Sequence, residues 1–356
     1  MKPSEERDGL VPSSEDFAPA DPFDRAPYRA LLDCDALKRL RSICFLGAID
    51  YLFHPNGRAA CRRHSRLDHS LSVAGLAFVY ARRAGLSDND EQHIVAAALL
   101  HDIGHGPLSH SLGPVFRQRF GIGPMEAGHA ILCGHAPVGI ELRRVLAGHR
   151  IDADRVRALI DGSALEPAGI LFRGPINIGT IDAVLRSYGY LSPRPVEASA
   201  RRVLEAALRR SAEDVRILDR FWELKDAVYR RLIHGPAGLL ADLTARRVLE
   251  RHGASLTPDA CYWTDTSLRR ALPELFALFA RLRGRTTDAN PAGCTVPEVV
   301  DIAMPRFTVD GAADGCRPER DAERYREITE IRRISVALPE IVIPMERPAT
   351  VQPGLW

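Results

Sequence analysis

The sequence lacks the marks of several protein classes. No stretch approaches the ~20 consecutive apolar residues of a membrane-spanning helix, and charges and prolines stand at the N-terminus where a secretion signal has an apolar core. The seven cysteines form no Cys-x-x-Cys pair and are scattered, as free thiols of a reducing compartment are. We therefore expect a cytoplasmic protein without a membrane anchor.

An excess of one charge is also missing. The 48 basic residues are matched by 46 acidic ones, which leaves a formal net charge of +2. Because the two kinds are interspersed, the charge pattern does not indicate a nucleic-acid surface. Apolar residues make up 46% of the chain and charged residues 26%, as in ordinary globular proteins. A chain of 356 residues is long enough to bury a large core.

Helical periodicity dominates the chain, so we expect a mostly α fold. Apolar residues recur at three- and four-residue spacing from residue 27 onward. Glycine, proline and aspartate are frequent over 286–320, which predicts loops, and the runs 333–338 and 341–344 have the pattern of short strands. The predicted organisation is a disordered or loosely docked arm (1–26), a helical core (27–190), further helices of the same fold (191–285) and an irregular extension with short strands (286–356).

A histidine and an aspartate stand side by side where a buried helix is expected to end. Residues 94–100 are apolar on every side, which predicts a helix at the centre of a bundle, and His101 and Asp102 follow directly. Gly104 then ends the helix, and His105 and His110 come within a few residues. A buried charge needs a partner or a metal ion. Metal ligation is therefore the economical explanation, and a capped helix end is the alternative.

A second histidine stands at the start of the preceding helix, which we expect over residues 67–84 with Gly85 as its stop. His69 lies in the first turn of that helix, where an isolated histidine would be a surface or capping residue. The next helix starts near Asp88, and Glu91 three residues later fits a capping box.

Two segments together resemble the HD-domain metal-dependent phosphohydrolases: Arg66-Leu67-Asp68-His69-Ser70-Leu71 and residues 97–110, Ala-Ala-Leu-Leu-His-Asp-Ile-Gly-His-Gly-Pro-Leu-Ser-His. Residues 40–47 and 221–229 are similar to the branch that contains the deoxynucleoside triphosphate triphosphohydrolases. The resemblance covers roughly residues 27–282. It implies a helical HD-domain core, metal-assisted hydrolysis of a phosphate ester or anhydride in a nucleotide, and a homo-oligomer. A deoxynucleoside triphosphate is the first substrate that it implies.

The resemblance assigns His69, His101 and Asp102 as metal ligands. Mixed imidazole and carboxylate ligands suit a divalent ion of Mn, Fe, Ni, Co, Zn or Mg. The sequence departs from the family at the fourth ligand, because the expected aspartate falls on Gly179. Asp182, one helical turn further along, is the candidate replacement, and a structural carboxylate is the alternative. The tyrosine that often contacts substrate in the family is replaced by Ala183.

The resemblance also implies roles for three other histidines. His105 and His110 occupy positions that orient water or protonate the leaving phosphate, and an imidazole exchanges protons near neutral pH. Met125 stands where the family has a further histidine, and His129 is the candidate substitute.

Three residues are candidate substrate contacts. Arg66 precedes His69, and a guanidinium binds phosphate oxygens bidentately. Lys225 and Tyr229 face the nucleotide pocket if the resemblance holds, and otherwise they are a solvated lysine and a core aromatic.

Two other functions fit the same residues. One is a two-metal phosphodiesterase or iron-dependent oxygenase of the HD type, in which His129 and His105 or His135 hold a second ion. The other is a non-catalytic nucleotide-binding HD protein whose metal site has been degraded at Gly179 and Met125.

Overall fold

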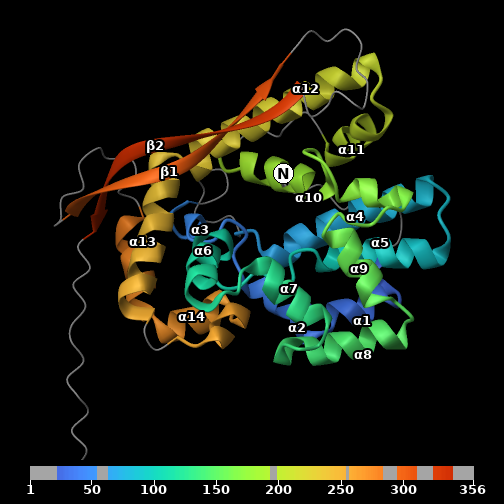
Figure 1. Ribbon diagram of the computed structural model, residues 1–356, viewed down its shortest axis with the longest axis horizontal. Coiled ribbons are helices and arrows are strands. Elements are labelled where there is room, and N and C mark those ends of the chain that lie inside the picture. The colour runs from blue at the N-terminus through green and yellow to red at the C-terminus, as the bar shows by residue number, and fades with distance from the viewer. Residues whose placement is uncertain are drawn as a thin grey trace, which may run out of the picture.

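The computed structural model describes residues 22–53, 63–192, 199–253, 256–283, 295–310 and 324–339. It is mostly α-helical, as the sequence predicts, and two long helices, α4 (Arg66–Arg83) and α5 (Asp88–Leu100), pack against each other on the right-hand side of the view in Figure 1. Within these residues no helix combines the length and the apolar character that crossing a membrane requires.

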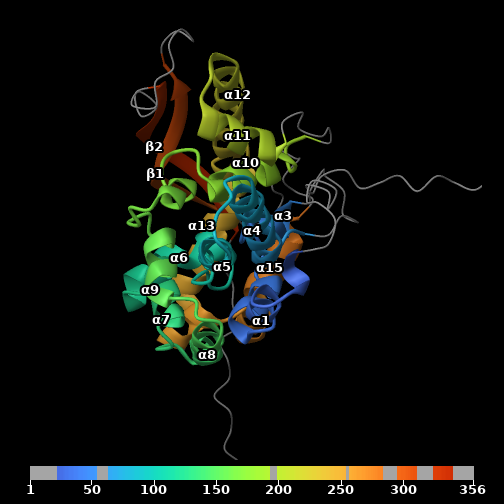
Figure 2. The ribbon, with the colours of Figure 1, turned by 90° about the vertical axis from the view of Figure 1, so that its right-hand side faces the viewer.

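The other elements surround this pair, with α1, α2 and α7–α9 at one end of the molecule and α11, α12 and a two-stranded ribbon at the other (Figures 1 and 2). Their bounds are α1 (Tyr28–Leu32), α2 (Asp35–Lys38), α3 (Ile49–Leu52), α6 (Ser109–Phe120), α7 (Pro124–Leu132), α8 (Ile140–Gly148), α9 (Ala153–Ile160), α10 (Ile178–Tyr188), α11 (Ala200–Arg209), α12 (Ala212–Val228), a π-helical turn (Tyr229–Ile233), α13 (Pro236–His252), α14 (Asp265–Ala271), α15 (Pro273–Leu282), β1 (Thr295–Val309) and β2 (Tyr325–Pro339).

Helix α5 is the buried centre that its apolar run predicts, since every residue from Ile94 to Leu100 is fully buried. Its N-terminus differs from the prediction. Ser87 is the N-cap, and its side chain accepts a hydrogen bond from the backbone N–H of Asp90. The predicted capping box of Asp88 and Glu91 is wrong because Glu91 turns inward and accepts hydrogen bonds from Tyr28 and Arg25.

The ribbon is a correction to the sequence analysis. β1 lies inside the region 286–320 that we expected to be irregular, and it pairs antiparallel with β2 along its whole length. Pro297 and Pro305 obscured the strand pattern. Both strands of a two-stranded sheet are edge strands, and edge strands tolerate proline because one side of the backbone needs no partner. Residues 1–21 of the predicted arm and the predicted strand 341–344 lie outside the described residues.

Two apolar clusters form the core. One gathers around α4, α5, α10 and α12, and the other around α3, α6, α13 and α15. The segment that follows α5 runs between them, because Ile103 belongs to the first cluster and Leu108 to the second. The chain from His101 to His110 therefore lies at the junction of the two cores.

Candidate metal centre

Three side chains converge at this junction. His69 comes from the first turn of α4, and His101 and Asp102 follow α5 directly. The Nε2 atoms of the two histidines lie 3.1 Å apart. The carboxylate of Asp102 lies 3.6 Å from Nε2 of His69 and 3.5 Å from Nε2 of His101. These three residues, which the sequence predicts as ligands, form a candidate metal cluster.

The end of α5 lets two adjacent residues reach one point. The helix stops at Leu100, and the chain then turns through residues 101–104. Gly104 is needed there, because a Cβ atom would lie 1.8 Å from the carbonyl oxygen of Pro124 at the start of α7. Arg39 donates hydrogen bonds to the carbonyl oxygens of Ile103 and His105 and fixes the turn from the other side.

Hydrogen bonds to the rear nitrogens of both histidines assign their tautomers. Nδ1 of His69 lies 2.6 Å from a carboxylate oxygen of Asp182, and Nδ1 of His101 lies 2.8 Å from the carbonyl oxygen of Ala98. Both partners are acceptors, so both Nδ1 atoms carry the proton. The two Nε2 lone pairs then face each other beside the Asp102 carboxylate, an arrangement that a divalent cation stabilises. The donor set therefore fits a metal ion.

Asp182 lies behind His69, on the side away from Asp102 and His101. Its carboxylate also binds the Arg186 guanidinium, at 2.9 Å from Nε and 3.0 Å from Nη2. Burial alone would raise the pKa of Asp182, but Arg186 and His69 outweigh burial and hold the pKa well below its usual value. In this position Asp182 fixes the orientation of His69, and direct ligation by Asp182 stays a prediction.

The backbone of α10 comes close to the cluster at Gly179. A Cβ atom on Gly179 would lie 3.7 Å from Nε2 of His101, an ordinary contact distance. The residue where the family has a ligand therefore faces the cluster and contributes no side chain.

Arg66 holds Asp102 from the other side. Its Nη1 donates to Asp102 at 2.8 Å, its Nε to the Ser109 hydroxyl at 2.9 Å, and its Nη2 to the carbonyl oxygen of Phe45 at 2.7 Å. Burial would raise the pKa of Asp102, but His101 and Arg66 hold it well below its usual range. Because all three guanidinium nitrogens have protein partners, Arg66 positions a ligand. Its role as a phosphate contact stays a prediction.

His105 and His110 lie beside Asp102. Nε2 of His105 is 3.4 Å from the Asp102 carboxylate, and the rings of His105 and His110 meet edge to face at 4.6 Å. Loss of solvent and the Arg66 charge lower the pKa of His105 to about 4. The pKa of His110 is also well below its usual value, first because protein atoms around the imidazole displace solvent and second because of the Arg66 charge. Part of the His110 side chain is nevertheless exposed to solvent.

His129 is held elsewhere. Its Nε2 lies 2.9 Å from a carboxylate oxygen of Asp161, in a contact between α7 and the residue that follows α9. Met125, where the family has a histidine, is 60% exposed. A catalytic role for His129 stays a prediction, and the described contacts do not join it to the cluster.

A cavity of about 340 Å³ adjoins the cluster, within the size range of small-molecule sites. Arg66 and His110 lie on its wall, and so do Lys225 and Tyr229, the two substrate contacts that the resemblance implies. The remaining lining residues are Phe45, Leu46, Ile49, Ser111, Thr180, Ala183, Val184, Ser187, Val228, Ile233 and Asp242.

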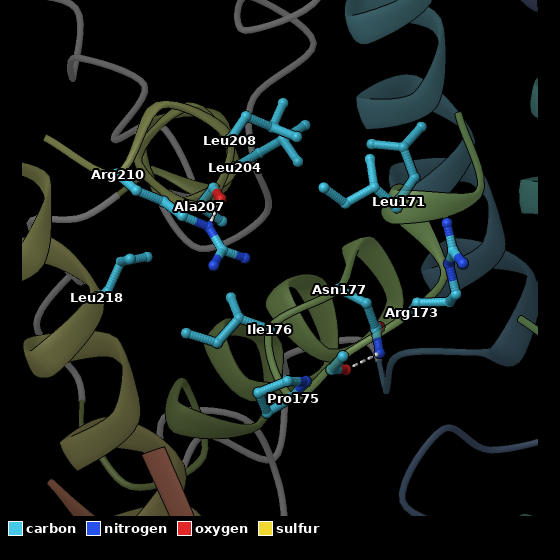
Figure 3. A pocket seen from close by; sticks show the side chains of 12 residues that line it. Leu171, Arg173, Pro175, Ile176, Asn177, Leu204, Ala207, Leu208, Arg210 and Leu218 are labelled. Atoms are coloured by element: carbon cyan, nitrogen blue, oxygen red, sulfur yellow. Dashed lines mark hydrogen bonds between the residues drawn. The ribbon is translucent and has the colours of Figure 1, made fainter. Parts of the chain in front are cut away.

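A second hollow lies near the N-terminus of α10, where leucines of α11 and α12 face Ile176 and Leu171 (Figure 3). Arg210 reaches across it and donates a hydrogen bond to the carbonyl oxygen of Ala207. Its volume of about 30 Å³ admits water and excludes a nucleotide. The larger cavity is therefore the candidate substrate site.

The sequence analysis missed three residues of this region: Arg186, Ser109 and Asp242. Arg186 had a usable signal, because it stands four residues after Asp182 on a predicted helix, the spacing of an ion pair. Ser109 and Asp242 had no such signal in the sequence, because Ser109 bonds to Arg66 and Asp242 bonds to Ser111, and each pair is far apart in the chain.

Comparisons with known proteins find matches in the part of the chain that carries the cluster. Residues 66–162 match the model of the HD domain family.

The uncharacterized protein YwfO of Bacillus subtilis is 34% identical over 133 residues, 36% of this chain and 28% of that protein. The deoxynucleoside triphosphate triphosphohydrolase SAMHD1 of Homo sapiens is 36% identical over 87 residues, 22% of this chain and 13% of that protein. The SAMHD1 homolog of Dictyostelium discoideum is 31% identical over 87 residues, 22% of this chain and 16% of that protein. Each match thus spans less than a third of the relative's length. The segment that matches the HD domain family therefore contains His69, His101 and Asp102.

Proposed function

We propose that this protein is a metal-dependent phosphohydrolase that acts on nucleotides. One observation carries the proposal. Two histidine lone pairs and a carboxylate converge, at 3.1 to 3.6 Å from one another, beside a cavity of about 340 Å³. The match to the HD domain family supports it.

His69, His101 and Asp102 would hold the ion. When bound, a divalent ion supplies Lewis acidity toward a phosphoryl oxygen. The protein's own groups do the rest. Asp182 keeps the proton of His69 on Nδ1, and Arg66 keeps Asp102 turned toward the histidines. In this proposal His105 and His110, which lie beside Asp102, would accept and pass on a proton.

Deoxynucleoside triphosphates are the first substrates to test, because two of the relatives carry that activity in their names. Lys225 and Tyr229 on the cavity wall are the proposed contacts to the nucleoside, and His110 and Arg66 lie where the wall meets the cluster.

A phosphate-release screen tests the proposal. The full chain is incubated with deoxynucleoside and ribonucleoside mono-, di- and triphosphates, and Mn²⁺, Fe²⁺, Co²⁺, Ni²⁺, Zn²⁺ and Mg²⁺ are supplied in turn. Phosphate and polyphosphate are both measured, since a triphosphohydrolase releases the latter. We expect His101→Ala and Asp102→Ala to lower the rate by about a hundredfold or more, because each removes a ligand.

His149→Ala, a histidine outside the cluster and the cavity, is the matched control and keeps the wild-type rate. Release from no nucleotide while one equivalent of metal is bound would overturn the hydrolase proposal and leave a nucleotide-binding protein. Two equivalents of metal per chain would favour the two-metal alternative.

A further inference from the structure

Two side chains of opposite charge line the cavity and are not paired with each other. Lys225 is 8% exposed, and its ammonium lies 4.3 Å from the ring centroids of both Trp222 and Phe307. The described residues offer it no hydrogen bond or ion pair. Loss of solvent lowers the pKa of Lys225 to about 8, and the charge of Glu327 on β2 opposes this shift without forming an ion pair.

The carboxylate is that of Asp242 on α13. One of its oxygens accepts a hydrogen bond of 2.6 Å from the Ser111 hydroxyl. No further hydrogen bond and no ion pair reaches it from the part of the chain that the structure describes. The guanidinium of Arg246 instead donates from Nε to the carbonyl oxygen of Ser111, at 3.2 Å. Burial raises the pKa of Asp242.

Lys225 is buried and Asp242 is half-buried, and a charged group removed from solvent needs hydrogen-bond partners. The described residues supply no hydrogen bond to Lys225 and a single hydroxyl to Asp242. A cavity occupant that satisfies both must offer an acceptor to the lysine and a donor to the aspartate. A phosphate group offers no donor when fully ionised, and the Asp242 charge repels it.

A nucleoside meets both requirements. Its base and sugar carry oxygens and ring nitrogens that accept, and amino and hydroxyl groups that donate. The apolar wall of Phe45, Leu46 and Val228 and the Tyr229 ring provide the surface on which a base can pack. The Asp242 contact is to Ser111, which follows His110 directly, so a nucleoside held there has its phosphate side near the cluster.

We infer that this cavity binds the nucleoside part of the substrate, with Asp242 accepting a hydrogen bond from a hydroxyl or amino group and Lys225 donating to an oxygen or ring nitrogen. The inference deepens the proposed function, on which it rests for the position of the phosphate. It assigns Asp242 as a residue that determines specificity.

Binding of nucleosides without phosphate tests the inference. The full chain, with Mn²⁺ present, is titrated calorimetrically with the four common deoxynucleosides, the four common ribonucleosides and, separately, inorganic phosphate. We expect at least one nucleoside to bind, and Asp242→Asn and Lys225→Met to weaken that binding by about 10- to 100-fold, the effect of losing a hydrogen bond to a charged group. The affinity for inorganic phosphate should not fall in Asp242→Asn. Glu250→Gln, the same change of charge at an exposed position of α13, is the control and binds as the wild type does.

Substrate analogues repeat the test on the unaltered protein, so the result does not depend on whether a variant folds. 2′,3′-Dideoxynucleosides lack the 2′- and 3′-hydroxyls, and purine ribosides without an amino group lack the base donor. Weaker binding of the first analogue class assigns the Asp242 contact to the sugar, and weaker binding of the second assigns it to the base. Unchanged binding of both classes, or unchanged nucleoside binding by a folded Asp242→Asn, would overturn the inference.

The result can be separated from that of the phosphate-release screen. A chain that binds nucleosides through Asp242 and releases no phosphate keeps the inference and loses the hydrolase. Phosphate release together with nucleoside binding that ignores Asp242 removes the inference alone.

Discussion

Gly179 determines how many protein groups surround the candidate metal cluster. It lies in the first turn of α10, and its missing side chain leaves space beside Nε2 of His101. A carboxylate in this turn is favoured by the helix dipole. Among the described residues the cluster therefore has three protein donors, with space for a fourth at Gly179.

Substitution of Gly179 by aspartate should tighten metal binding. A Cβ atom fits at 3.7 Å from His101 Nε2, so the added carboxylate can join the donor set without a backbone shift. We expect Gly179→Asp to bind Mn²⁺ about 10- to 100-fold more tightly, measured by calorimetry. Without metal the variant should be less stable than the wild type, because the new charge lies near Asp102 and Asp182.

Gly179→Ala is the matched variant, since it adds the Cβ atom and no ligand. Its metal affinity should stay within about threefold of the wild type, while replacing a helical glycine stabilises the metal-free chain by up to about 1 kcal/mol. Equal metal affinity in the aspartate and alanine variants would show that residue 179 does not face the ion.

At the scale of single residues, the sequence predicted which side chains are candidate ligands, and it did not predict how they lie relative to one another. His69, His101 and Asp102 follow from the motif and from the burial of α5. The position of Asp182 could not be predicted, because one helical turn decides whether its carboxylate reaches an ion or the Nδ1 atom of His69. That choice depends on how α10 lies against α4, which no local pattern specifies.

At the scale of elements, the ribbon packs behind the part of the cavity wall that Lys225 and Tyr229 form. Phe307 of β1 packs on Trp222 of α12 at 5.4 Å and on Tyr229 at 4.7 Å between ring centroids, and it covers the ammonium of Lys225. Arg324, just before β2, forms an ion pair with Asp219 of α12 at 2.6 Å. The ribbon therefore fixes the end of α12 that carries Lys225 and the π-helical turn that begins with Tyr229.

Removing the Phe307 ring should lower both the free energy of unfolding and the affinity for nucleosides. Phe307→Ala leaves a cavity in a buried aromatic cluster, and such changes cost about 3 to 5 kcal/mol. Urea unfolding measures that cost. Nucleoside affinity of the folded fraction should also fall, because Lys225 loses the ring that covers it.

Ile331→Ala is the control on the same ribbon, since Ile331 is 76% exposed. Its free energy of unfolding should change by less than about 0.5 kcal/mol. Equal effects of the two substitutions would mean that the ribbon does not pack on α12 as described.

The helices α4 and α5 were predictable because their apolar patterns are long and each has a continuous buried stretch, residues 72–77 in α4 and 93–100 in α5. β1 was not, since its prolines and its polar residues belong to an edge strand that packs on helices distant in the sequence.

At the scale of the whole molecule, Asp265 joins the C-terminal helices to the loop of the site. From α14 its carboxylate accepts hydrogen bonds from the backbone N–H of Leu108 at 2.8 Å, from the backbone N–H of Cys44 at 3.1 Å and from the Tyr51 hydroxyl at 3.0 Å. Leu108 has a φ of 53°, a left-handed conformation that costs a non-glycine residue free energy. Asp265 thus holds the turn that places His110, although it lies outside the HD domain match of residues 66–162.

Asp265→Asn tests this connection. An asparagine has a single acceptor oxygen, so its amide NH₂ would face one of three groups that also donate. We expect a loss of about 2 to 3 kcal/mol in the free energy of unfolding, the cost of unsatisfied buried donors near a lost charge. Phosphate release should fall as well, because the turn before His110 loses the hydrogen bond from Leu108 to Asp265.

Asp259→Asn, which changes an exposed aspartate that precedes α14, is the control and should leave both the free energy of unfolding and the rate of phosphate release unchanged. A stable Asp265→Asn protein with full activity would mean that residues 66–162 and their neighbours hold His110 without the C-terminal helices.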